Sequence, residues 1–186
     1  MTHTVRRLLD YEYPRYRKHL KKLDSNSRYL RFGIPIRDES IDQLCDLIEQ
    51  DHDHHILFGI ENRELELVAV GHIALGEDME LAFSVLKEYQ GQGMGSKLMK
   101  RCIQWCRTHG ILEGMMVCLS HNTVIKHLCA KYGIRTVSEH GETLAYIHLD
   151  PAGPGTYLEE AVDRNAAIID YWTKRSFRPR RLSTAQ

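Results

Sequence analysis

The stretch Gln90-Gly91-Gln92-Gly93-Met94-Gly95 decides the fold, because of the segments on either side of it. Before it, residues 80–86 form a short apolar run with the character of a buried strand, and after it residues 96–106 carry apolar side chains at helical spacing. Glycines let a backbone approach a phosphate closely, and the N–H groups at a helix start point towards it. The order of strand, glycine-rich turn and helix therefore predicts a cradle for an anion.

The spacing of the glycines narrows the kind of anion. It is neither the dinucleotide-binding GxGxxG motif nor a P-loop, since no Gly-Lys-Ser/Thr follows. It resembles the Gln/Arg-x-x-Gly-x-Gly/Ala pattern that grips the pyrophosphate of coenzyme A in the GNAT acetyltransferases. The chain resembles that superfamily from about residue 3 to residue 149. The resemblance implies an enzyme that moves an acetyl group from acetyl-CoA to a primary amine, by direct attack in a ternary complex.

The composition predicts one globular domain. The chain has 186 residues, zero formal net charge, 42% hydrophobic and 27% charged residues, which is ordinary for a protein with a real core. The neutral balance does not favour nucleic acid as a partner, and no apolar run approaches the roughly 20 residues that cross a membrane. With no signal-peptide core near the N-terminus, we expect a cytoplasmic protein. Its five cysteines form no CxxC framework, so we expect reduced core residues.

The hydrophobic pattern predicts a mixed α/β fold over residues 1–150, followed by a linker and an amphipathic helix with a basic tail over residues 151–186. It fits a GNAT fold, with a mixed twisted sheet of about six to seven strands and helices on both faces. We expect a turn at residues 24–27 and a linker at residues 151–155. The expected strands are residues 3–8, 55–60, 65–75, 79–86, 114–119, 135–139 and 144–149, and the expected helices are residues 12–23, 39–50, 96–109, 122–132 and 157–174.

The resemblance assigns the coenzyme A site. The pyrophosphate would be held at the loop by the backbone of Gln92, Gly93, Gly95 and Ser96, with Gly91 as a further glycine of the loop and weaker indications for Gln90, Met94 and Lys97. The pantetheine arm would pair with Phe83, Ser84 and Val85, where a bulge is expected to splay this strand from the next. A backbone N–H near Val85 would then stabilise the oxyanion. Asn122 would either hydrogen-bond the pantetheine or only cap the helix that follows it.

Two motifs resemble the bacterial protein-lysine acetyltransferases and suggest a catalytic base. Residues 27–32, Ser-Arg-Tyr-Leu-Arg-Phe, match that branch before its second helix, and Met-Glu-Leu-Ala at residues 79–82 matches it at the start of strand four. The resemblance implies that Glu80 removes the proton from the attacking amine. Strand alternation puts Glu80 on one face with Ala82 and Ser84, half-buried beside an apolar cleft, where a carboxyl pKa rises. Otherwise Glu80 is solvated or pairs with Arg31, and His121 is the alternative base.

The general acid is left open. Many family members place a tyrosine seven residues after the asparagine, but here that position is Cys129. Tyr132 lies ten residues on, roughly 60° further round a helix of 3.6 residues per turn, so we expect it to point elsewhere. Cys129, another tyrosine or water could protonate the thiolate. The acceptor, a protein lysine or a small-molecule amine, also stays open. A non-catalytic module that senses acetyl-CoA is the alternative to an enzyme.

Two further features of the sequence are examined for a function, a histidine-rich segment and the last helix. Residues 51–55, Asp-His-Asp-His-His, offer His52 and His55 to a divalent ion, but nothing else completes a site, so we expect no metal. The last helix, residues 157–174, carries an apolar face that must be buried. It could pack on its own domain or on a second copy, which would make a homodimer.

Overall fold

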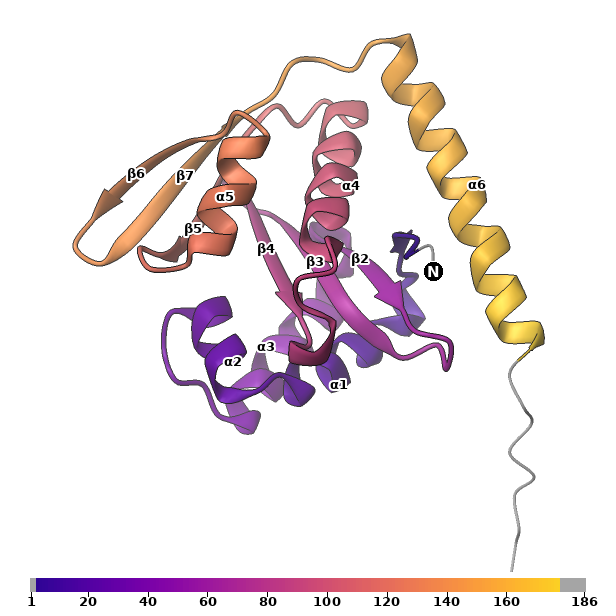
Figure 1. Cartoon of the computed structure of the whole chain (residues 1–186), viewed down its shortest axis with the longest axis horizontal. Coiled ribbons are helices and arrows are strands. Elements are labelled where there is room, and N and C mark those ends of the chain that lie inside the picture. Colours follow the sequence, from indigo (N-terminus) through magenta and orange to yellow (C-terminus); the bar gives the residue numbers. More distant parts are fainter. Residues whose placement is uncertain (1–2, 178–186) are drawn as a thin grey trace, which may run out of the picture.

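The computed structural model describes residues 3–177 and shows one seven-stranded sheet with helices on both faces (Figure 1). The strand order is β1-β2-β3-β4-β5-β7-β6, and every neighbouring pair is antiparallel except β4 and β5. This confirms the predicted mixed sheet. The strands are β1 (Arg6–Arg7), β2 (His55–Glu61), β3 (Leu67–Leu75), β4 (Met79–Val85), β5 (Glu113–Leu119), β6 (Arg135–Glu139) and β7 (Glu142–His148).

Helices enclose the sheet from both sides. Helices α1 (Pro14–Lys22) and α3 (Asp38–Gln50) pack together with α1 against β3, and α2 (Ser25–Phe32) lies by β4 and β5. On the opposite face α4 (Met94–Thr108) crosses β2, β3 and β4, with α5 (Thr123–Lys131) between α4 and β6. The long helix α6 (Pro154–Ser176) stands outside α4, at the edge of the domain (Figure 1).

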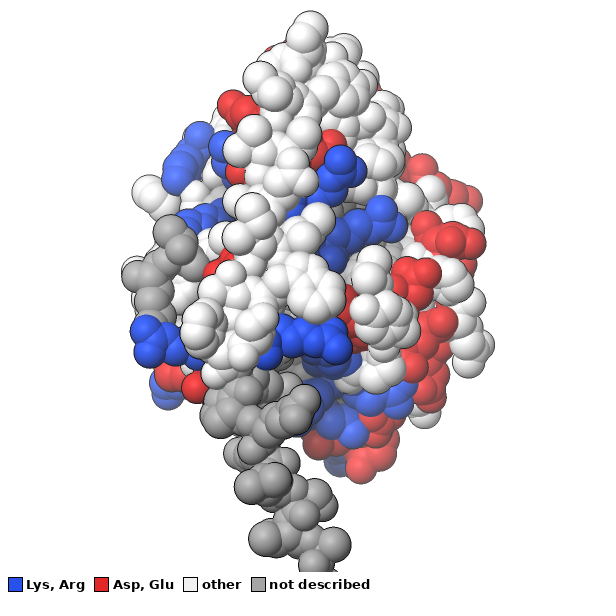
Figure 2. Space-filling model, turned by 90° about the vertical axis from the view of Figure 1, so that its right-hand side faces the viewer, with Lys and Arg blue, Asp and Glu red and all other residues white. Residues whose placement is uncertain are grey.

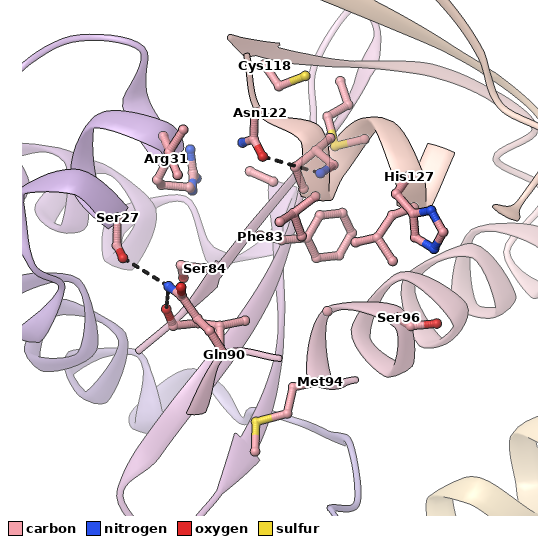
Figure 3. Close-up of a pocket in the computed structure, with 18 of the residues that line it drawn as sticks. Ser27, Arg31, Phe83, Ser84, Gln90, Met94, Ser96, Cys118, Asn122 and His127 are labelled. Carbon is pink, nitrogen blue, oxygen red and sulfur yellow. Dashed lines mark hydrogen bonds between the residues drawn. The ribbon is translucent and has the colours of Figure 1, made fainter. Parts of the chain in front are cut away.

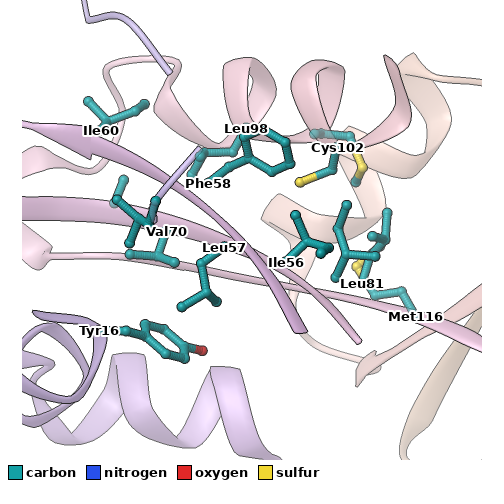
Figure 4. Packing of buried hydrophobic residues seen from close by; sticks show 14 of the residues in the cluster. Tyr16, Ile56, Leu57, Phe58, Ile60, Val70, Leu81, Leu98, Cys102 and Met116 are labelled. Atoms are coloured by element: carbon teal, nitrogen blue, oxygen red, sulfur yellow. The ribbon is translucent and has the colours of Figure 1, made fainter. Parts of the chain in front are cut away.

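Strand alternation builds two cores, one on each face of the sheet. In β2, Phe58 lies beside Leu98 of α4, whereas Leu57 lies on the side of Tyr16 from α1 (Figure 4). All of these side chains are almost completely buried. The five cysteines are also free and buried, which confirms their prediction as core residues. Within residues 3–177, no helix has both the length and the apolar character that a membrane crossing requires.

Three local predictions are wrong. Residues 24–27 begin helix α2 instead of forming only a turn, because the Asp24 carboxylate accepts the N–H groups of Asn26 and Ser27 as an N-cap. Aspartate and serine favour turns and helix caps for the same reason, so the sequence did not separate the two. The first strand contains only Arg6–Arg7, and Pro154, expected in the linker, occupies the first turn of α6.

Candidate active site

The site lies where β4 and β5 part. These parallel strands pair only at their starts, Met79 with Gly114 and Glu80 with Met115. A side chain at Gly114 would put its Cβ 2.6 Å from Met79 Cε and closer still to the Met79 carbonyl oxygen, so glycine allows this close approach. Beyond it, residues 81–85 and 116–118 form the two walls of a cavity of about 500 Å³.

The parting does not come from a bulge, so that prediction is wrong. β4 keeps one register with β3 along its whole length, from Leu75 opposite Met79 to Ala69 opposite Val85. β5 instead pairs with β7 over all seven of its residues and follows it away from β4. The gap therefore arises because β5 pairs along its whole length with β7, on the side away from β4.

The free edge of β4 presents backbone groups to the cavity. Leu86 N–H donates to the Val68 carbonyl on β3. Since alternate residues of a strand face opposite neighbours, the N–H groups of Phe83 and Val85 face the side that β5 has left. Both residues line the cavity, as does Ser84. A ligand with a chain of amides could add itself to this edge as a short strand.

Ser84 is held from behind by a buried histidine. The Nδ1 of His19 lies 3.0 Å from the Leu67 carbonyl oxygen, which can only accept, so Nδ1 carries the proton. The Nε2 of His19 then accepts from the Ser84 hydroxyl at 2.9 Å. Burial lowers the pKa of His19 to about 4, so this imidazole is neutral at physiological pH. The pair fixes the hydroxyl towards α1, away from β5.

The glycine-rich loop ends directly at the mouth of the cavity. Gly91 and Gly93 both have φ of 75°, a left-handed conformation that glycine adopts without strain. Gly93 caps α4, and Lys97 N–H is bonded to its carbonyl. The N–H groups of the preceding first-turn residues therefore have no acceptor within the helix. Of the residues predicted for the cradle, Gly91, Gly93, Met94, Gly95 and Ser96 line the cavity, whereas Gln92 and Lys97 do not.

The two glutamines of the loop behave differently. The Gln90 amide donates to Ser27 Oγ at 3.0 Å and to the Val85 carbonyl at 3.1 Å, so it ties the loop to α2 and to the end of β4 (Figure 3). Gln92 donates instead to the Glu88 carbonyl at 3.2 Å and does not line the cavity. Sequence spacing alone did not separate these two roles.

Asn122 lies at the far wall and caps α5, as predicted. Its Oδ1 accepts the N–H of Ile125 at 3.3 Å (Figure 3). The residue is buried and lines the cavity. Its Nδ2 has no hydrogen-bond partner within residues 3–177, so the cap leaves a donor for a ligand.

The residues considered as general base or general acid lie outside the lining of the cavity. Glu80 is exposed rather than half-buried and lies just outside the lining, next to Leu81, and makes no ion pair with any described residue. Cys129 is completely buried, does not line the cavity, and burial raises the pKa of its thiol to about 11. Tyr132 points elsewhere, as expected, and donates to the Ser96 carbonyl at 2.8 Å.

Basic residues that the sequence reasoning did not assign to the site complete its lining. Arg31 of α2 faces the cavity (Figure 3), and its buried Nε has no hydrogen-bond partner among the described residues. Its charge contributes to lowering the pKa of buried His72, after the larger effect of burial. At the opposite end Lys131 of α5 contacts Ser96 Oγ at 2.6 Å. The cavity thus has a cation at each end and an apolar middle.

The histidine-rich segment does not join this site. His55 Nδ1 lies 3.0 Å from Nε2 of His72, and His52 lies 3.6 Å from both Asp10 and Asp53. Among residues 3–177, no three potential ligands come together as a metal site would require.

Known proteins share this architecture. The family model described as the acetyltransferase (GNAT) family matches residues 20–134, more than half of the chain. An acetyltransferase of Pseudomonas aeruginosa is 25% identical over 150 residues, covering 77% of this chain and 81% of that protein.

Solved structures agree on the fold. The GNAT domain of S. lividans PAT superposes with a TM-score of 0.64 at 19% identity, covering 78% of this chain and 89% of that chain. The PaiA N-acetyltransferase of Thermoplasma acidophilum, solved in complex with coenzyme A, gives a TM-score of 0.59 at 14% identity, with coverage of 80% and 99%. With the parted strands and the glycine loop, the family match shows that this chain belongs to the GNAT family of N-acetyltransferases.

Proposed function

We propose that the protein transfers acetyl from acetyl-CoA to a primary amine by direct attack, with Glu80 as the base. The observation that carries the proposal is the open edge of β4 beside the start of α4. A thioester on an amide-containing arm and a pyrophosphate need these two features at adjacent places.

The loop and the strand edge would share the work of holding the cofactor. The free N–H groups of the first turn of α4 bind the pyrophosphate, favoured by the positive end of the helix dipole. Lys131 at the same end adds a charge for phosphate. The N–H groups of Phe83 and Val85 pair with the pantetheine amides and with the thioester carbonyl, where the Val85 N–H stabilises the developing oxyanion. The Asn122 amide nitrogen donates to the pantetheine from the opposite wall.

The acceptor would enter from the α2 side, where Arg31 and Ala82 line the cavity. An ammonium cannot attack a thioester, so its proton must leave first. Glu80 shares the face of β4 that carries Ala82, and it is open to solvent, so a water molecule can relay the proton to its carboxylate. The guanidinium of Arg31 favours the neutral amine over the ammonium by charge repulsion.

The test is CoA release from acetyl-CoA across a panel of amines and lysine peptides. The wild type should turn over at least one acceptor. Glu80→Gln should lower kcat by a factor of about 10² to 10⁴, the usual contribution of a general base, with acetyl-CoA affinity unchanged. Glu77→Gln, an exposed glutamate three residues earlier, is the matched control and should keep wild-type rates. If Glu80→Gln turned over at the wild-type rate, Glu80 would not be the base, but the protein would still be an acetyltransferase.

A protein lysine is the acceptor that we favour within this class. The segment that resembles the protein-lysine branch, residues 27–32, forms most of α2 and brings Ser27, Leu30 and Arg31 to the cavity. Faster turnover of lysine peptides than of free amines of equal size would support this choice. Turnover of small amines alone would replace it.

A further inference from the structure

Helix α6 turns its polar face towards the domain. Its less exposed residues repeat at intervals of four and three and include Thr156, Glu160, Asp163, Ala167, Asp170 and Lys174. Glu160 pairs with buried Arg101 of α4 at 3.3 Å, and Lys174 donates to the Glu61 carbonyl at 3.0 Å. Of the whole helix only Ala167 is fully buried. The helix is therefore attached to the domain mainly by polar contacts.

The opposite face of α6 is apolar and faces solvent. At 100° per residue, a second stripe with the same spacing lies roughly opposite the first, and it consists of Leu158, Val162, Asn165, Ile169 and Trp172. Its four apolar side chains are exposed by 67, 59, 67 and 56%, respectively. Figure 2 shows an uncharged column along this side of the molecule, with charged residues on both flanks. An ordinary surface helix turns its apolar face towards the core, whereas α6 turns its apolar face towards solvent.

We propose that this stripe binds the same stripe of a second copy, with the two α6 helices antiparallel about a twofold axis at Asn165. Residues that alternate at intervals of four and three form the line of contact between the helices of a two-helix coiled coil. In the antiparallel register Leu158 meets the second copy's Trp172, Val162 is level with the second copy's Ile168 and beside its Ile169, and the two Asn165 amides meet each other. An interface of this kind is self-complementary, as twofold symmetry requires.

The buried area and the opposed helix dipoles support a second copy as the occupant. Before Asn165 the helix has three acidic residues and one basic residue, and after it one acidic and two basic residues up to residue 177. Four of these side chains, Glu160, Asp163, Asp170 and Lys174, face the domain and do not meet the second copy. Antiparallel pairing nevertheless opposes the helix dipoles, which is favourable. The stripe with its neighbours Tyr157, Ala161 and Ile168 would bury roughly 600–700 Å² per copy, close to the ~800 Å² of a standard interface.

The pairing leaves the active sites free, because no residue of α6 lines the cavity. Sedimentation and light scattering should give twice the chain mass of 21.6 kDa for the wild type at micromolar concentration. Ile169→Glu should weaken association at least 100-fold and keep wild-type acetyl-CoA binding, which shows that the domain is folded. Arg164→Glu, a charge change on the same helix outside the stripe, should still dimerise.

Single cysteines test the orientation. Asn165→Cys should form a disulfide between copies on oxidation, because the two positions meet at the axis. Leu158→Cys alone should not, since antiparallel copies place the two thiols about 21 Å apart along the helix at 1.5 Å per residue, far beyond disulfide reach. A mixture of Leu158→Cys and Trp172→Cys proteins should cross-link to each other. A monomeric wild type at 100 µM, or cross-linking of Leu158→Cys with itself, would overturn the proposal.

Discussion

The buried His19 should make the fold sensitive to mild acid. Burial lowers the pKa of His19 from 6.5 to about 4. As pH falls below 6.5, the unfolded chain takes up a proton there and the folded chain does not, so the free energy of unfolding falls until about pH 4. Each pH unit corresponds to about 1.4 kcal/mol. Between pH 6.5 and 5 this residue alone should remove about 2 kcal/mol of stability.

Urea unfolding between pH 5 and 7.5, followed by circular dichroism, measures the effect. His72 and His55 also have lowered pKa values through burial and act in the same direction. The comparison with His19→Gln isolates the contribution of His19. The variant should be less stable at pH 7, since the Ser84 contact is altered, but its stability should fall with a slope smaller by about one proton. His148→Gln, an exposed histidine, should keep the wild-type slope. Parallel pH curves for wild type and His19→Gln would refute the reasoning.

Three other substitutions test the site. Gly114→Ala should lower the free energy of unfolding by about 1–3 kcal/mol and weaken acetyl-CoA binding measured by calorimetry, because its Cβ forces the paired starts of β4 and β5 apart. Gly76→Ala, whose Cβ meets nothing nearer than 3.7 Å, should do neither. Gly93→Ala and Gly33→Ala have similar positive φ and should cost similar stability, but only Gly93→Ala should raise the Kd for acetyl-CoA, by about tenfold or more. Arg31→Gln should move the acid limb of the kcat profile up by about one pH unit, because a cation no longer disfavours the bound ammonium; an unmoved profile would contradict this role.

The sequence pattern was enough to predict those elements whose formation depends on residues close to each other in the chain. The glycine loop, its flanking strand and helix, and the Asn122 cap follow from residues close to each other in the sequence. One miss depends on a distant partner. The parting of β4 from β5 follows from the pairing of β5 with β7, which comes later in the chain.

The direction in which a side chain faces was the other limit. Apolar spacing predicted that α6 has an apolar face but not that this face would turn outward, since that depends on Arg101 binding Glu160. In the same way alternation placed Glu80 on one strand face with Ala82 and Ser84, but it did not predict that Glu80 is exposed while Ser84 is buried.

The burial of the five thiols makes their reaction with a thiol reagent a measure of how often the folded protein opens. Burial raises the pKa of Cys45 and Cys129 to about 11 and of Cys106 to about 12, and raises the others as well. A thiolate is the form that reacts with disulfide reagents, so the native protein should barely consume them. Such a reagent will then count each thiol that the reaction liberates almost without background. In the absence of substrate, the slow residual labelling will record how often the folded molecule opens.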